Sequence, residues 1–355
     1  LQDLQRKLEQ GEVLVEYVLG PAKSYALAID RNQIRSYRLP SRSEIEAASA
    51  EYVGAVKSFE DATSVARRLQ QLVLEPVELA NGAKRLIVVP DGRLHDVPFD
   101  ALIDPSGSFL VSATVVSYAP SASVNYYLSR GQKNHRSDAR RAFLAVGGVR
   151  YGSGSRLDRI RMALRGGNLF DPDAPTSLVA LPGTVKEISA LGAQAGGGAD
   201  ILTGDQATES AVKAADLPSY ETLHFAVHAS IDEEFPDRSA LRLTPEPGGA
   251  EDGLLQAREI LELPLRANLV TLSACDAGSG RIEEIAGMNS LVRAFLLAGA
   301  RTVVASTWPA EDNATAALMR SFYRHLTSGA DKAEALTLAK RDLLAKYGSN
   351  AQPFL

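Results

Sequence analysis

One histidine and the only cysteine of the chain have the types and positions that could carry out covalent chemistry. His228 lies near the end of an apolar run over residues 221–230, and Cys275 ends another run over residues 268–275. A cysteine nucleophile needs its thiolate form, which a nearby imidazole can provide. The two residues are 47 positions apart, enough chain for one connection between neighbouring strands. If those strands are adjacent, both side chains reach the same edge of a sheet.

A single cysteine also has a plainer interpretation, as an inert buried side chain. It excludes disulfides within the chain, zinc sites built from several cysteines, and iron–sulfur ligation. It fits a reducing compartment, so we expect a cytoplasmic protein. Small neighbours favour the reactive role, since they let a substrate backbone approach closely. These neighbours are Ala226, Ala229, Ser230, Ser273, Ala274, Ala277 and Gly278.

The second half of the chain alternates between apolar strands and helices. Strands are predicted over 142–149, 200–206, 221–230, 268–275 and 301–307, and helices over 184–194, 208–217, 287–299, 313–328 and 331–347. Thr184 and Glu187 have capping-box spacing, which predicts the start of the first of these helices. Such alternation is typical of a parallel sheet covered on both faces, which binds ligands beyond the carboxyl ends of its strands.

The first half has a different pattern, and a length of 355 residues suggests about two domains. Three short β-type runs, over 12–20, 24–30 and 34–40, predict a meander. Helices are predicted over 43–80 and one buried strand over 85–92. A polar, basic stretch over 128–141 indicates a domain boundary. We therefore predict a non-catalytic companion domain over residues 1–135 and a catalytic domain over residues 136–355.

Several segments of the chain occur together in a recognisable order. They are GEVLVEYVLG, RLIVVPDGRLHDVPFDAL, SYAPSASV, LHFAVHAS, EDGLLQAREILELPL, NLVTLSACDAGSG and LVRAFLLAGARTVVASTWPAEDNATAALMRSFYRHL. This series resembles the CHAT-domain family of caspase-like proteins over nearly the whole chain. The resemblance implies a caspase-like α/β fold, with a mostly parallel sheet covered by helices on both faces and a smaller N-terminal α/β companion (pseudo-peptidase) domain. It also implies a cysteine endopeptidase with His228 and Cys275 as its dyad.

The resemblance further implies an oxyanion hole made by the backbone N–H groups of Ala229 and Cys275. The family usually has glycine after the histidine, and Ala229 stands there in this sequence. A positive φ at that position would cost alanine energy that glycine avoids. The hole is therefore either intact or weakened. The alternative function is a catalytically weak or dead caspase-like module used for protein interaction.

Substrate preference is indicated by residues around the dyad. Relatives that prefer basic residues tend to have an acid two positions before the cysteine, where this chain has Ser273. We therefore expect a small or medium apolar residue before the cut. Ser306 and Trp308 stand at the end of the next strand and are expected to line the cleft, although a tryptophan is equally often a core anchor.

Other functions have weaker support in the sequence. A net charge of −5 argues against a general nucleic-acid binder, and no apolar run is long enough to span a membrane. No GxGxxG, Walker or nucleophile-elbow motif occurs in a fitting context. A zinc site from His224, His228 and Cys275 would lack the metalloprotease glutamate and further cysteines, so we interpret His224 as a packed core residue and expect no metal or cofactor.

The partners that we expect follow from the same resemblance. They are a protein substrate and an upstream tetratricopeptide-repeat (TPR) or sensor module, or another activating partner, in a bacterial defence role. We expect neither a membrane nor a nucleic acid among them. Because the sequence begins at Leu1 and ends at Leu355 without a polar tail, we interpret it as the C-terminal effector part of a longer protein.

Overall fold

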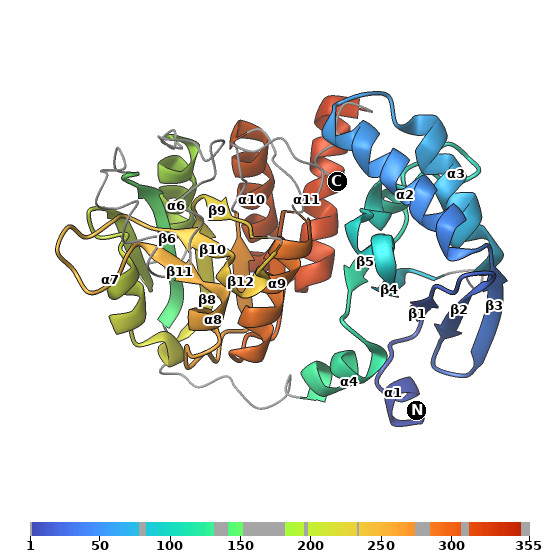
Figure 1. Cartoon of the computed structure of the whole chain (residues 1–355), viewed down its shortest axis with the longest axis horizontal. Coiled ribbons are helices and arrows are strands. Elements are labelled where there is room, and N and C mark those ends of the chain that lie inside the picture. The colour runs from blue at the N-terminus through green and yellow to red at the C-terminus, as the bar shows by residue number, and fades with distance from the viewer. Residues whose placement is uncertain are drawn as a thin grey trace. The chain divides into compact units, whose positions relative to one another are not determined.

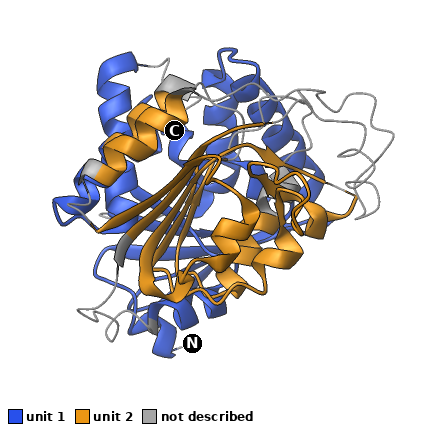
Figure 2. Ribbon diagram, turned by 90° about the vertical axis from the view of Figure 1, so that its left-hand side faces the viewer, with its two compact units in different colours: residues 1–135, 321–355 blue, residues 136–320 orange. Residues whose placement is uncertain are grey.

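The chain forms two compact units in a computed structural model (Figure 2). Unit 1 comprises residues 1–135 together with 321–355, and unit 2 comprises residues 136–320. The structure describes residues 2–77, 83–130, 141–151, 182–194, 198–232, 234–273, 285–306 and 312–348. Cys275 and Trp308 therefore lie outside the described residues. The predicted loop over 150–182 also lies outside them, except for its first two residues and its last.

Unit 1 is built on a five-stranded mixed sheet in the order β3-β2-β1-β4-β5 (Figure 1). Its strands are β1 Glu12–Val18, β2 Ser24–Ile29, β3 Ile34–Leu39, β4 Arg85–Val89 and β5 Val115–Tyr118. The pairs β1–β2 and β2–β3 are antiparallel, which confirms the predicted meander, whereas β1–β4 and β4–β5 are parallel. Its helices are α1 Gln2–Gln5, α2 Arg42–Lys57, α3 Thr63–Val73, α4 Ala122–Arg130 and α11 Lys332–Tyr347.

Helix α11 lies near the C-terminal end of the sequence, and polar contacts bind it to the rest of unit 1. Lys340 Nζ lies 3.0 Å from Asp100 Oδ2, and these side chains are only 10% and 4% exposed. Arg341 Nε donates to the Val111 carbonyl at 2.7 Å. The segment 321–355 thus groups with the first part of the chain. The predicted division into a companion domain over 1–135 and a catalytic domain over 136–355 stays a prediction.

Unit 2 contains a five-stranded sheet in the order β13-β12-β8-β6-β7, and every pair in it is parallel. Its strands are β6 Arg141–Val149, β7 Ala199–Gly204, β8 Tyr220–Ala226, β12 Leu269–Leu272 and β13 Val303–Ala305. A second, three-stranded sheet has the order β11-β10-β9, formed by β9 Ala229–Ser230, β10 Ala240–Arg242 and β11 Leu254–Gln256. The helices are α6 Pro182–Gln194, α7 Glu209–Ala214, α8 Ala257–Ile260 and α9 Ile285–Leu297. Helix α10, Asp312–Thr327, begins in unit 2 and ends in unit 1.

Helices cover both faces of the parallel sheet, as two neighbouring residues of β8 show. Successive side chains of a strand point to opposite faces. Phe225 packs on Phe295 of α9, with ring centroids 5.6 Å apart. On the other face, His224 Nε2 lies 2.9 Å from Oε1 of Glu187 in α6. Unit 2 is therefore an α/β arrangement with its parallel sheet covered on both faces, as predicted, and its main apolar core lies on the α9 face.

The start of α6 differs from the prediction. The helix begins at Pro182, so Thr184 lies within its first turn and is not the N-cap. Proline suits the first turn because its φ is already helical and its missing N–H is not needed there. Thr184 Oγ1 instead accepts the Gly148 N–H at 3.1 Å, and Glu187 faces His224.

Short 3-10 turns complete the described chain. They are η1 Glu75–Val77, η2 Gly92–Asp96, η3 Phe99–Ala101, η4 Leu110–Ser112, η5 Leu217–Ser219 and η6 Pro236–Arg238. Within the described ranges, no helix combines the length and apolar character that crossing a bilayer requires.

Candidate active site

The run that was predicted as one strand over 221–230 is two strands in two sheets. β8 ends at Ala226, and β9 begins at Ala229 in the three-stranded sheet. His228 lies in the connection, because its backbone leaves the parallel ladder and its carbonyl accepts the Arg242 N–H of β10 at 2.8 Å. His228 therefore lies just beyond the carboxyl end of the central strand, the edge where the sequence predicted chemistry.

His228 is held by a residue that the sequence analysis missed. Its backbone N–H donates to Tyr151 Oη at 2.8 Å. The two rings pack with centroids 4.8 Å apart and planes tilted by 51°. Tyr151 lies two residues after the end of β6, the parallel neighbour of β8. Ligands bind beyond the carboxyl ends of parallel strands, and this rule could have identified Tyr151 as a candidate site residue.

Burial raises the pKa of Tyr151 to about 12, although the His228 N–H and the Arg242 charge act in the opposite direction. The phenol is therefore neutral at physiological pH. The His228 side chain beside it is only 1% exposed. Its ring therefore lies in a packed environment.

Ala229, the expected oxyanion-hole residue, has ordinary strand geometry. It pairs with Leu241, and the neighbouring N–H of Arg242 donates to His228. Hydrogen-bonded and non-hydrogen-bonded pairs alternate in an antiparallel ladder, so Ala229 occupies a non-hydrogen-bonded pair. Its N–H therefore points away from β10. Among the described residues other than glycine, only Phe59 has a positive φ. Alanine is therefore not strained at position 229.

Two of the residues that were predicted to contact the substrate, Ser273 and Ser306, lie within the described residues, and each follows one of two neighbouring strands. Ser273 comes directly after β12 and donates its N–H to the Phe225 carbonyl at 2.8 Å. Ser306 comes directly after β13, which pairs with β12 through Ala305 and Leu272. Ser273 is buried and Ser306 is half-buried. Both therefore lie at the same edge of the sheet as the connection that contains His228.

His224 does not share the environment of His228. Its side chain is fully buried on the α6 face, where Glu187 lies beside Nε2. This agrees with the interpretation of His224 as a packed core residue. Glu187 was not expected as its partner, because the spacing of Glu187 from Thr184 indicated a helix cap.

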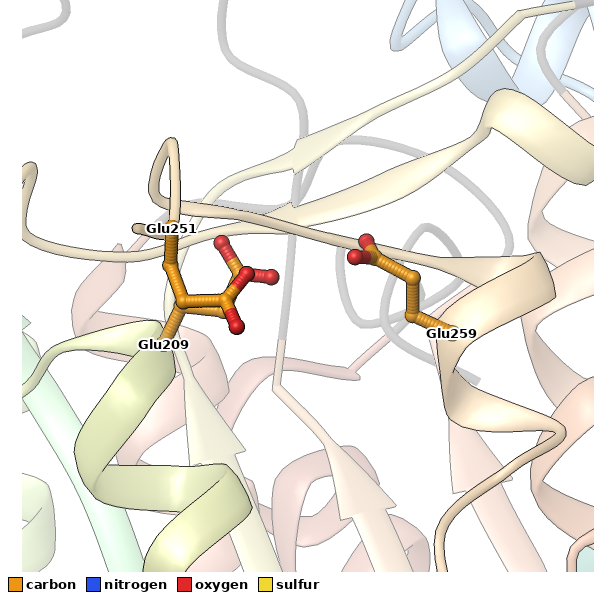
Figure 3. Close-up of side chains that lie close together, drawn as sticks. All are labelled: Glu209, Glu251 and Glu259. Carbon is orange, nitrogen blue, oxygen red and sulfur yellow. The ribbon is translucent and has the colours of Figure 1, made fainter. Parts of the chain in front are cut away.

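A second polar cluster lies elsewhere in unit 2 and joins three carboxylates. Glu209 of α7, Glu259 of α8 and Glu251 of the β10–β11 connection turn toward one another (Figure 3). Lys213 Nζ lies between 2.7 and 3.0 Å from an oxygen of each. Glu209 also accepts the Gly253 N–H at 2.9 Å. The lysine ammonium thus supplies the positive charge that a metal ion would otherwise bring to these three carboxylates.

Comparison with known proteins gives matches to sequence and to structure. A family model, the CHAT domain, matches residues 63–355. Tetratricopeptide repeat protein 28 of Mus musculus is 29% identical over 193 residues, which cover 43% of this chain and 8% of that protein. The Homo sapiens protein of the same name is 30% identical over 175 residues, covering 39% of this chain and 7% of that protein. The chain thus spans only a small part of the length of these curated relatives.

Among solved structures, a chain of the Saccharomyces cerevisiae separase–securin complex matches 98% of this chain and 30% of its own length. The TM-score is 0.55 at 10% identity, and this likeness shows the fold. The Arg-specific cysteine proteinase gingipain R matches 88% of this chain and 73% of its own, with a TM-score of 0.45 at 9% identity.

Proposed function

Because the chain belongs to the CHAT-domain family, we propose that it is a regulated cysteine endopeptidase with His228 and Cys275 as its catalytic dyad. Unit 2 carries His228 and the strand that leads to Cys275. The segment 1–135 acts as a non-catalytic companion. No metal or cofactor takes part.

The observation that carries this proposal is the pairing of β8 with β12. The two strands are parallel neighbours, and the Ser273 N–H donates to the Phe225 carbonyl. Phe225 precedes His228 by three residues, and Ser273 precedes Cys275 by two. Two residues of extended chain span at most about 7 Å, which supports a dyad at this edge of the sheet.

The reaction runs through a thioester. His228 takes the proton of the Cys275 thiol, and Sγ attacks the scissile carbonyl carbon. The N–H groups of Ala229 and Cys275 stabilise the oxyanion. The C–N bond breaks as His228 gives a proton to the leaving amine. His228 then takes a proton from a water molecule, whose oxygen attacks the thioester. Breaking the C–S bond releases the carboxylic acid and restores the thiol.

The substrate is a protein, with Ser273, Ser306 and Trp308 lining the cleft. A small or medium apolar residue precedes the cut, because Ser273 offers no charge to a basic one. The names of the curated relatives support an upstream TPR module as the controlling element. A cytoplasmic location and a role in bacterial defence stay predictions.

A fluorogenic positional-scanning peptide library tests the activity with the full chain. We expect cleavage by the parent protein and a loss of at least about 100-fold in Cys275→Ala and in His228→Ala. Thermal unfolding of each variant confirms that it is folded. Equal rates in parent and variants would instead favour the interaction module. The ordinary φ of Ala229 removes one argument for that alternative.

A further inference from the structure

We propose that Tyr151 is a positioning residue that fixes both the backbone and the imidazole ring of His228. The inference rests on the proposed function, because it assigns Tyr151 a role through His228. Two separate contacts carry it: the hydrogen bond from the His228 N–H to Tyr151 Oη, and the packing of the two rings.

The backbone contact replaces a bond of the regular ladder. His228 and Arg242 face each other where two strands would normally exchange a pair of hydrogen bonds. One of these is made, since the Arg242 N–H donates to the His228 carbonyl. The His228 N–H donates to Tyr151 instead. The residue is thus held from two sides, by β10 and by the segment that follows β6.

A bulge in β6 precedes Tyr151 and helps to aim it. The register between β6 and β7 shifts between Gly147 and Val149. Gly148 has a φ of +59°, and a Cβ there would lie 2.7 Å from side-chain atoms of Thr203 and Val185. Glycine is therefore required at this position. Bulges bend a strand and re-aim the side chains beyond it, and Tyr151 follows three residues later.

The ring contact restricts the imidazole itself. A general acid must lie within hydrogen-bond reach of the atom that it protonates, and small displacements reduce the rate strongly. The tilted Tyr151 ring lies 4.8 Å from the imidazole, and His228 is almost fully buried. The packing therefore limits rotation of the imidazole ring, and the backbone hydrogen bond fixes the main chain from which the side chain extends.

Another tyrosine of unit 2 offers a matched control. Tyr220 begins β8, and its hydroxyl donates to Asp200 of β7, at the opposite end of the strand from His228. Tyr220→Phe therefore removes a buried hydroxyl from the same strand without touching the histidine. Tyr151→Phe keeps the aromatic ring and removes the acceptor. Tyr151→His keeps both a ring and a possible acceptor.

Alkylation by iodoacetamide tests the role without knowledge of the substrate. The chain has one cysteine, so all thiol labelling reports on Cys275. Second-order rates are measured at about pH 6 and about pH 8.5, because an imidazole-paired thiol stays reactive below the ordinary thiol pKa. Peptide cleavage by the same samples gives kcat and KM.

At about pH 6 we expect the parent to react about 100-fold faster than His228→Ala. Tyr151→Phe should lose about tenfold, with the pH dependence moving toward that of His228→Ala and kcat falling while KM is unchanged. Tyr220→Phe should stay within about twofold of the parent. Tyr151→His should recover most of the loss.

The outcomes separate the two proposals. If the parent reacts no faster than His228→Ala at either pH, the dyad itself is wrong. If the parent is enhanced but Tyr151→Phe matches it in rate and pH dependence, only the role of Tyr151 is overturned. Should Tyr151→Phe not fold, Tyr151→His decides: a parent-like rate supports the role, and a rate equal to that of His228→Ala contradicts it.

Discussion

The backbone N–H of Ser273 donates to the Phe225 carbonyl at 2.8 Å and joins the carboxyl ends of β12 and β8. The bond extends the pairing of Leu272 with Phe225 by one residue. Ser273 is buried, so its small side chain lies in a packed position at the edge where His228 follows. The size and charge of residue 273 therefore bear directly on the space next to the proposed dyad.

Changing Ser273 is expected to change the substrate preference of the proposed peptidase. The parent should cleave after small or medium apolar residues and not after Arg or Lys. Ser273→Asp places a carboxylate at this edge and should raise the relative kcat/KM for a basic residue at least about tenfold, as one favourable charge contact allows. A positional-scanning library measures both proteins.

Ser273→Asn is the matched control, because it adds nearly the same volume without charge. A strong preference of the parent itself for Arg would contradict the assignment of Ser273.

The N–H of Ala229 can be removed without breaking the ladder, since it points away from β10. Ala229→Pro should therefore reduce kcat for peptide cleavage about 100-fold, as loss of one oxyanion donor does. β9 is the edge strand of its sheet, where proline is tolerated. Ala229→Gly keeps the N–H and should change kcat by less than about threefold, because alanine is not strained there.

Alkylation by iodoacetamide separates this effect from damage to His228. The displacement of iodide develops no oxyanion, so Ala229→Pro should keep the alkylation rate of the parent. A parallel loss of alkylation would mean that the variant disturbs His228 and does not test the hole.

Lys213 supplies the charge that balances Glu209, Glu251 and Glu259. Lys213→Met should lower the free energy of unfolding by about 3 kcal/mol, because it leaves three neighbouring carboxylates without a cation. The open cluster should then bind Ca²⁺, whose ligands are oxygens. Calcium at millimolar concentration should raise the Tm of Lys213→Met and leave that of the parent unchanged.

An exposed pair provides the control. Arg68 and Glu51 are both more than half exposed, so Arg68→Met should cost less than about 1 kcal/mol and create no response to calcium. Equal calcium responses of Lys213→Met and Arg68→Met would show that the carboxylates do not converge as described.

Stability should also depend on pH through Glu209. Burial raises the pKa of this carboxyl to about 7, above its value in the unfolded chain. Between about pH 4.5 and pH 7 the folded state therefore holds a proton that the unfolded state has released. This contribution is fully present below about pH 4.5 and is lost as the pH rises through about 7, by an amount on the order of 1 kcal/mol.

Urea unfolding at a series of pH values measures this effect. Glu209→Gln should remove that part of the slope, whereas Glu51→Gln, at an exposed position, should not. Parallel curves for the parent and Glu209→Gln would rule out the contribution.

The strand–helix alternation of the second half could be predicted because each buried strand is a short apolar run bounded by turn residues. The break before His228 could not, since LHFAVHAS carries no glycine or proline at the place where β8 leaves its sheet. The register that brings Tyr151 to His228 depends on a bulge, which local pattern does not fix. The carboxylate cluster joins residues 209, 251 and 259, whose proximity follows only from tertiary packing.

The two-part make-up of unit 1 has a consequence for synthesis on the ribosome. Residues 136–320 are complete before α11, which packs beside Asp100, has been translated. Because domains fold as units in the order in which they emerge, the sheet next to His228 can form while the companion unit still lacks its last helix. A translation product that stops after residue 320 and before residue 332 would therefore contain the whole segment of unit 2, with His228, and lack helix α11 of unit 1.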